Sequence, residues 1–378
     1  MKRRLLLIVV GILLVSGCSV PASKIADETP EKKTELLPAY NKQTAAKPEG
    51  ETAGKGSTDA ALTGGIRSPQ TVYNIQESET PQEVKKSRDL LITLYYQDGD
   101  GLIVPVARRF ERQEGIARAA VGALVDTSLN REELEYYGIY PVLPQGTEIL
   151  GINIKQGTAF VDFSSKLLDY KDSLAERNIV SSVVYTLTEF ASVNAVKFMV
   201  DGKELRKLKF GTDAAGALDR TNTLLNSTRV NLQNGLSKLD IYLAKYVNNI
   251  HLYILPVSVE YKKQEYEDVP AKAVELLRGK DYQGNLQTEL PQGSKLLKSS
   301  ISGNTLILDF DNRIRNYGGT TREDIILKQL LFTMKQFEGV KRIKILIDGK
   351  PGTLPEGTEI TGELDIPPVI NDFLSKDL

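Results

Sequence analysis

The chain repeats itself at a distance of 147 residues, and this repeat constrains how its core can be built. From 143 to 203 and from 290 to 350 the two segments share 19 identities in 61 positions without a gap. Units of solenoid proteins are roughly 20 to 50 residues long, so copies this far apart are separate domains, each with its own core. The repeated motifs include Leu143-Pro144-Gln145-Gly146 with Leu290-Pro291-Gln292-Gly293, Val161-Asp162-Phe163 with Leu308-Asp309-Phe310, and Asp201-Gly202-Lys203 with Asp348-Gly349-Lys350.

The repeat predicts two tandem homologous α+β domains, over residues 89–222 and 236–366, followed by a tail over 367–378. In each copy, alternating apolar residues and turn signals indicate two hairpins and a closing strand, and apolar residues at helical spacing indicate two helices. A small sheet covered on one face by two helices is the expected architecture. In the first copy these patterns cover 90–109 (hairpin), 116–125 (helix), 149–163 (hairpin), 173–190 (helix) and 196–200 (strand).

The longer helix has the same expected start in both copies. Ser173-Leu174-Ala175-Glu176 and Thr320-Thr321-Arg322-Glu323 both have the spacing of a capping box. In such a box the hydroxyl accepts from an amide of the first turn, and the glutamate reaches back to the amide of the capping residue. We therefore expect these glutamates to stabilise the helix starts.

Cys18, the one cysteine of the chain, follows the features of a lipoprotein signal peptide over residues 1–17. Lys2, Arg3 and Arg4 precede an apolar run of about eleven residues, which is shorter than the roughly 20 that span a bilayer. Small residues then lead directly to the thiol. The sequence predicts a diacylated Cys18 that holds the protein to the extracytoplasmic face of the membrane.

Residues 18–88 are predicted to be the lipid anchor and a disordered linker. The segment is rich in Thr, Glu, Lys, Ala, Pro and Gly and contains few large apolar residues. Such a composition buries too little surface to offset the entropy of ordering. A flexible chain of about 70 residues has a root-mean-square span of roughly 45 Å, so the linker lets the folded domains stand clear of the bilayer.

The composition argues against most enzyme classes and against nucleic acid. The net charge is −1, which gives no overall attraction for a polyanion. His251 is the one histidine, and lipid occupies Cys18, so neither a histidine pair nor a cysteine cluster is available for a metal or a nucleophile. No enzyme or phosphate-loop motif is present. We therefore expect no catalytic residue, cofactor or metal.

Asp162 and Asp309 are the candidate acid–base pair, one in each copy. No second acid or base recurs beside them in both copies. This favours the interpretation of Asp162 and Asp309 as polar residues at strand ends over a catalytic role. The Asp-Gly-Lys motifs likewise favour a turn over a binding loop, because glycine permits the backbone of a tight turn.

Three other features break the symmetry of the repeat or join its copies. His251 lies in a strand and is interpreted as structural. The Tyr136-Tyr137 pair lies in a six-residue surplus of the first copy, and is interpreted as a packing insert, with a contact surface as the alternative. In the connector 219–235, Leu224, Leu225 and Val230 are candidates for packing between the domains.

Taken together, the signal peptide, Cys18, the linker and the paired domains resemble the GerM-type sporulation and spore-germination lipoproteins with two tandem GerM-N (GerMN) domains. The matching residues are Leu143 to Thr147, Val161-Asp162-Phe163, Thr186 to Phe190, Val200 to Lys203 and Gly211-Thr212, with looser matches in the second copy.

This resemblance implies a non-enzymatic protein whose domains are similar to the ring-building modules of secretion systems. It implies envelope partners in the channel-like complex between mother cell and forespore, and a location facing the space between those membranes. The resemblance implies no particular oligomeric state. Two alternatives stay open: a surface lipoprotein that binds a ligand or cell-wall fragment in a pocket, and a hydrolase that acts through Asp162 or Asp309.

Overall fold

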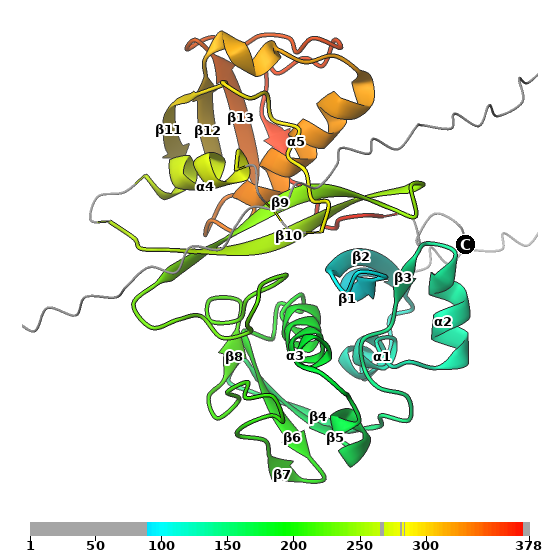
Figure 1. The fold of residues 1–378 in the computed structure, drawn as a ribbon. Helices are drawn as coiled ribbons and strands as arrows, with labels where there is room; N and C mark the ends of the chain where they lie inside the picture. The colour runs from blue at the N-terminus through cyan, green and yellow to red at the C-terminus, as the bar shows by residue number, and fades with distance from the viewer. Residues whose placement is uncertain (1–88, 265–267, 280–281, 283, 373–378) are drawn as a thin grey trace, which may run out of the picture. The chain divides into compact units, whose positions relative to one another are not determined.

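The computed structural model describes residues 89–264, 268–279, 282 and 284–372. The predicted signal peptide, Cys18 and the linker lie outside the described residues, as does the end of the predicted tail. The described chain folds into two α+β copies of the same arrangement, as the repeat predicts (Figure 1).

The elements of the first copy follow the expected order, with one addition. Between the first helix and the second hairpin stand a further helix, α2, and the short strand β3, where the sequence has its six-residue surplus. The elements are β1 (Leu90–Asp98), β2 (Ile103–Phe110), α1 (Ile116–Gly122), α2 (Ser128–Glu135), β3 (Ile139–Tyr140), β4 (Ile149–Lys155), β5 (Thr158–Phe163), η1 (Ser165–Leu168), α3 (Ser173–Leu187), β6 (Ala195–Val200), β7 (Lys203–Glu204) and β8 (Leu218–Asp219).

The second copy repeats this order without counterparts of α2, β3 and β7 among its described residues. Its elements are β9 (Ser237–Val247), β10 (His251–Tyr261), α4 (Val269–Leu277), β11 (Leu296–Ser302), β12 (Thr305–Phe310), η2 (Asn312–Arg315), α5 (Thr320–Met334), β13 (Arg342–Ile347) and β14 (Leu364–Asp365).

Each copy has three layers rather than a sheet and one helical layer. The second hairpin and the closing strand form a sheet in which β5 pairs parallel with β6, and β12 with β13. The first hairpin, β1–β2 or β9–β10, is a separate ribbon on the other side of the helices (Figure 1). A parallel pair needs a long crossover, and the longer helix of each copy supplies it. The helices are thus apolar on two sides, which explains why α3 is buried along most of its length.

The predicted capping boxes are wrong. The N-cap of α3 is Asp172, whose side chain accepts from the Ala175 amide at 2.8 Å, and Gly319 precedes α5 with no side-chain cap. Glu176 instead accepts from the amides of Phe210 and Thr212, at 2.6 and 3.0 Å. Its burial, at 1% exposure, places it under the loop that follows the closing strand, out of reach of its own helix start.

Glu323 does the same in the second copy. Its carboxylate accepts from the amides of Glu356 and Thr358, at 2.9 and 3.2 Å, and from the Tyr317 hydroxyl at 2.8 Å. Tyr170 donates equivalently to Glu176. Burial opposes the ionisation of each glutamate, but these donors hold the pKa of both carboxyls below the usual range. The repeated Tyr and Glu therefore fasten a loop in each domain.

Candidate functional site

Asp162 and Asp309 occupy matching structural positions. Both carboxylates accept the amide of the glycine in the following Asp-Gly-Lys motif: Asp162 from Gly202 at 3.0 Å and Asp309 from Gly349 at 2.8 Å. In both copies the Asp and Gly of the motif have positive φ, which is the backbone of the predicted turn. The two aspartates thus hold turns at the ends of their sheets, and the geometry favours the structural interpretation of both motifs.

His251 and the tyrosine pair lie where the α2 insert meets the second copy. The His251 Nε2 atom lies 3.0 Å from the Tyr136 carbonyl oxygen, and the Tyr253 hydroxyl donates to the Tyr137 carbonyl at 2.8 Å. The rings of Tyr136 and Tyr137 also pack beside the imidazole. The insert therefore packs against the β9–β10 hairpin, although the Tyr136 side chain itself is 74% exposed.

The two copies meet along β2 and β10, where two asparagines bridge the strand edges. Asn226 exchanges hydrogen bonds with both backbone groups of Ile103 and donates to the Pro256 carbonyl at 2.8 Å. Asn371 does the same with Ile254 and donates to Pro105 at 2.7 Å. Each asparagine thus binds its own copy and a proline of the other copy.

The residues before the two asparagines also bond across this contact between the copies, which we call the joint. The Leu225 carbonyl accepts from the Ser258 amide at 2.9 Å, and the Ile370 carbonyl accepts from the Ala107 amide at 3.1 Å. The connector residues Leu224, Leu225 and Val230 are buried, and Leu225 and Val230 belong to an apolar core that contains residues of both copies, as expected for packing between the domains. Residues 367–372, which we assigned to a tail, are partly engaged in this joint through Ile370 and Asn371.

A buried ion pair also crosses the joint. Lys245 of β9 donates to Asp98 at 2.6 Å and to Asp100 at 2.7 Å, and the side chains of Lys245 and Asp98 are 3% and 1% exposed. Asp98 also accepts two amides of its own turn, from Asp100 and Leu102. Burial disfavours the Lys245 charge, yet the two carboxylates raise its pKa above the usual lysine value. Lys245 therefore keeps its charge in this buried contact.

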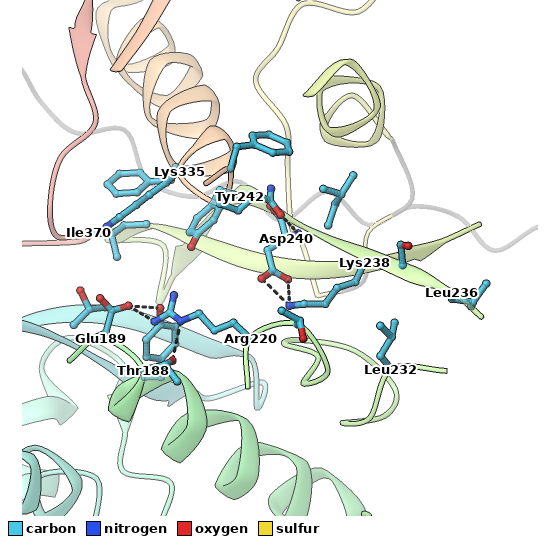
Figure 2. Close-up of a pocket in the computed structure, with 18 residues that line it drawn as sticks. Thr188, Glu189, Arg220, Leu232, Leu236, Lys238, Asp240, Tyr242, Lys335 and Ile370 are labelled. Carbon is cyan, nitrogen blue, oxygen red and sulfur yellow. Dashed lines mark hydrogen bonds and ion pairs between the residues drawn. The ribbon is translucent and has the colours of Figure 1, made fainter. Parts of the chain in front are cut away.

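A cleft of about 820 Å³ opens between the copies on one side of this joint (Figure 2). The first copy and its connector contribute the end of α3 and Arg220, and the second copy contributes β9 and the end of α5. Its polar lining residues include Thr93, Tyr95, Thr188, Glu189 and Arg220 from the first side, and Lys238, Asp240, Tyr242, Lys335 and Gln336 from the second.

Arg220 caps the end of α3 and faces the cleft. Its Nε donates to the Thr188 hydroxyl at 2.8 Å, and Nη2 donates to the Tyr185 carbonyl at 3.0 Å and to Glu189. A cation at a helix C-terminus interacts favourably with the helix dipole. Burial opposes the charge, but Tyr95 and Glu189 raise the pKa of Arg220 well above its usual value.

Lys238 and Asp240 form a second pair in the wall of the cleft (Figure 2). The lysine donates to both carboxylate oxygens, at 2.9 and 2.8 Å, and to the Tyr185 hydroxyl at 2.6 Å. The Ser258 hydroxyl donates to the same carboxylate. Burial lowers the pKa of Lys238, and Asp240 offsets that effect only in part.

Other classes of site receive no support from the described residues. Within the described part of the chain, no group of three or more His, Cys, Asp or Glu side chains is placed to hold a metal ion. The same residues contain no helix long and apolar enough to cross a bilayer.

Sequence reasoning missed the cleft because its residues come from six separated segments of the chain. A signal was nevertheless available in the repeat. Tyr95 and Tyr242 correspond at the 147-residue offset, whereas Thr188 corresponds to Lys335 and Glu189 to Gln336. Where matched positions of the two copies differ in charge, the side chains make different contacts in each copy.

Comparison with known proteins agrees with the repeat. The family model Germane, described as sporulation and spore germination, matches residues 93–206 and 240–353. The spore germination protein GerM of Bacillus subtilis (strain 168) is 29% identical over 305 residues, covering 78% of this chain and 82% of GerM. The solved structure of the tandem GerMN domains of the sporulation protein GerM from Bacillus subtilis matches with a TM-score of 0.65 at 27% identity, covering 75% of this chain and 99% of that one.

These matches cover both copies in the order and spacing that the repeat predicts, and the solved structure shares their α+β fold. The chain belongs to the Germane family, a sporulation and spore germination protein with two tandem GerMN domains.

Proposed function

We propose that this protein is a lipid-anchored assembly protein that docks its paired GerMN domains onto envelope proteins between mother cell and forespore. The observation that carries the proposal is the role of the repeated polar residues. Asp162, Asp309, Glu176 and Glu323 all bind backbone amides of their own domain. Their engagement in the fold favours binding over catalysis.

The joint between the copies supports the same proposal. Two asparagine bridges, a buried ion pair and a continuous apolar core join the domains, so that they present their outer surfaces in one fixed relation. A rigid pair loses less conformational entropy on docking than two independent domains would. Such a unit is suited to assembly with partners of defined spacing.

The membrane part of the proposal rests on the sequence before the folded region. Two acyl chains on Cys18 give stable anchoring, whereas one chain gives only marginal binding. A tether confines the domains near the membrane and raises their effective concentration at partners in the same or the facing membrane.

Fractionation of sporulating cells tests the anchor. The Cys18→Ala variant of the full-length protein should leave the membrane fraction or accumulate unprocessed, while Ser19→Ala should behave like the unchanged protein. If Cys18→Ala remained in the membrane fraction in processed form, the lipid anchor would be ruled out.

Crosslinking in the same cells tests the partner. The anchored protein should yield crosslinks to envelope proteins of the channel complex, and these should decrease in the Lys245→Met variant described below, which destabilises the contact between the two copies. Reproducible absence of any envelope protein from the crosslinked products would contradict the assembly role.

A further inference from the structure

We propose that the cleft between the two copies binds a small organic carboxylate that also carries an apolar group. The assignment goes beyond the assembly role and does not depend on it, since it concerns a cavity lined by both copies and not an outer surface. Its volume of about 820 Å³ lies in the range of small-molecule sites, roughly 300 to 1,000 Å³.

The charges of the cleft leave one cation without an anion. Arg220 pairs with Glu189, and Lys238 pairs with Asp240. Lys335, at the end of α5, donates to the Pro368 carbonyl at 2.7 Å and has no carboxylate within ion-pair distance among the described residues. The lining therefore carries an excess positive charge at Lys335, which a ligand anion would neutralise.

Two further donors face the same space. The Tyr242 hydroxyl makes no hydrogen bond to any residue that the structure describes, and Figure 2 shows it directed toward the side that holds Arg220 and Glu189. The Arg220 guanidinium uses Nε and Nη2 for its contacts, and Nη1 has no hydrogen-bond partner in the described chain. Tyr242, Arg220 and Lys335 all line the cleft, and a carboxylate accepts up to about four hydrogen bonds, so these are the donors we expect a ligand carboxylate to use.

The rest of the lining is apolar and calls for an apolar part in the ligand. These residues are Leu232, Leu236, Leu239, Phe332, Phe337 and Ile370. A free inorganic anion would leave this surface in contact with water, whereas an aliphatic or aromatic substituent would cover it.

The repeat shows that the two copies carry different polar groups at the ends of their long helices. Lys335 replaces the Thr188 of the first copy, and Gln336 replaces Glu189, while the helices end at the matching residues Leu187 and Met334. Gln336 holds the backbone of Asp240 through two hydrogen bonds, so it does not neutralise Lys335. At these two positions the second copy thus has a cation in place of a hydroxyl and a neutral amide in place of an anion.

Calorimetric titration of the purified full-length protein with N-acetyl-L-phenylalanine tests the proposal, since this probe joins a carboxylate to an aromatic ring. Its uncharged amide, N-acetyl-L-phenylalaninamide, is the matched control ligand. We expect the acid to bind in the millimolar range or tighter, and the amide to bind about tenfold more weakly, because a charge-assisted contact is lost.

Variants locate the site. Lys335→Met should weaken binding of the acid about tenfold, and Tyr242→Phe should weaken it by a smaller factor of about three. Lys328→Met is the matched control, because Lys328 lies on the same helix, pairs with Asp324 at the surface and does not line the cleft. Thermal unfolding of each variant without ligand confirms that it is folded.

Three results would overturn the proposal. They are no binding of the acid up to about 10 mM, equal binding of acid and amide, and equal weakening or no weakening in the Lys335 and Lys328 variants. A loss confined to Lys335→Met and Tyr242→Phe supports it. Because the titration uses isolated protein, its failure would leave the crosslinking result of the assembly proposal unaffected.

Discussion

The two GerMN copies carry the same side chains where each maintains its own fold, and different side chains where one copy meets the other. Tyr170 and Glu176 correspond to Tyr317 and Glu323 at the 147-residue offset, and they make the same contacts. At the joint, Asp98 corresponds to Lys245 at the same offset, and the two form an ion pair. Residues that are identical in the two copies therefore maintain the fold of each domain. Matched residues of opposite charge instead form the contact between the first copy and the second.

This difference determines which domains can pair. If two first copies met through this joint, Asp98 would face Asp98, and two second copies would place Lys245 against Lys245. Like charges in a buried contact are costly, whereas the pairing of unlike copies partners both groups. The joint thus favours association of the first copy with the second over association of either with itself.

The largest effect is expected from removing the cation of the joint. Lys245→Met leaves the buried Asp98 carboxylate without its counter-ion, and should lower the free energy of unfolding by about 4 kcal/mol. Urea unfolding followed by circular dichroism measures this change in the free energy of unfolding. The exposed Lys328→Met change should cost no more than about 0.5 kcal/mol. Equal costs for the two variants would show that the joint does not depend on this pair.

The repeated glutamates provide a matched comparison inside the two copies. Glu176→Ala and Glu323→Ala should each cost about 3 kcal/mol, because each removes the charged acceptor of two loop amides and a tyrosine hydroxyl. Unfolding by urea should give similar values for the two variants. If one glutamate proved dispensable, the two loops would not be held by the same interaction.

The same glutamates predict a dependence of stability on pH. Their folded pKa values are depressed, so their contribution is present above the ordinary glutamate pKa and is lost as the pH falls toward the folded value. Glu176→Gln combined with Glu323→Gln should therefore flatten the decline of stability on acidification. Urea midpoints measured between neutral and acidic pH check this slope.

The asparagine bridges should have an intermediate effect. Asn226 and Asn371 both have positive φ, so glycine keeps the backbone while removing the side-chain bonds. Asn226→Gly and Asn371→Gly should each cost about 2 kcal/mol in thermal or urea unfolding, and alanine should cost about 1 kcal/mol more because of the backbone strain. Unequal losses of stability at the two positions would show that the two bridges do not contribute equally to the joint.

The smallest effect is expected at the strand-end aspartates. Asp162→Asn and Asp309→Asn keep an oxygen that accepts the glycine amide, so each should cost less than about 1 kcal/mol. Sporulation efficiency should also remain unchanged. A loss of sporulation with unaltered stability would instead favour the hydrolase hypothesis for these residues.

Much of the fold was predictable because periodicity and repetition are local signals. Both hairpins, the long helix and the closing strand lie where apolar spacing places them, and the Asp-Gly-Lys turns form as expected. The capping boxes failed although their spacing was correct. Glu176 and Glu323 form stronger contacts with a loop more than 30 residues away, and a local motif carries no information about such a partner.

The candidate site was predictable only in part. The connector residues Leu225 and Val230 were correctly expected to pack into the core shared by the two copies, and Leu224 is buried as well. The cleft itself was missed, since Arg220, Tyr242 and Lys335 come together only when the two copies dock.

The sequence by itself determined that this protein has two copies of one α+β domain, and it predicts a lipid anchor at Cys18, because both inferences follow from residue order. Only the tertiary structure decided how the copies join and which charges face the cleft between them. Those contacts depend on the docking of two surfaces, and residues 147 apart, such as Asp98 and Lys245, become partners only once that docking has occurred.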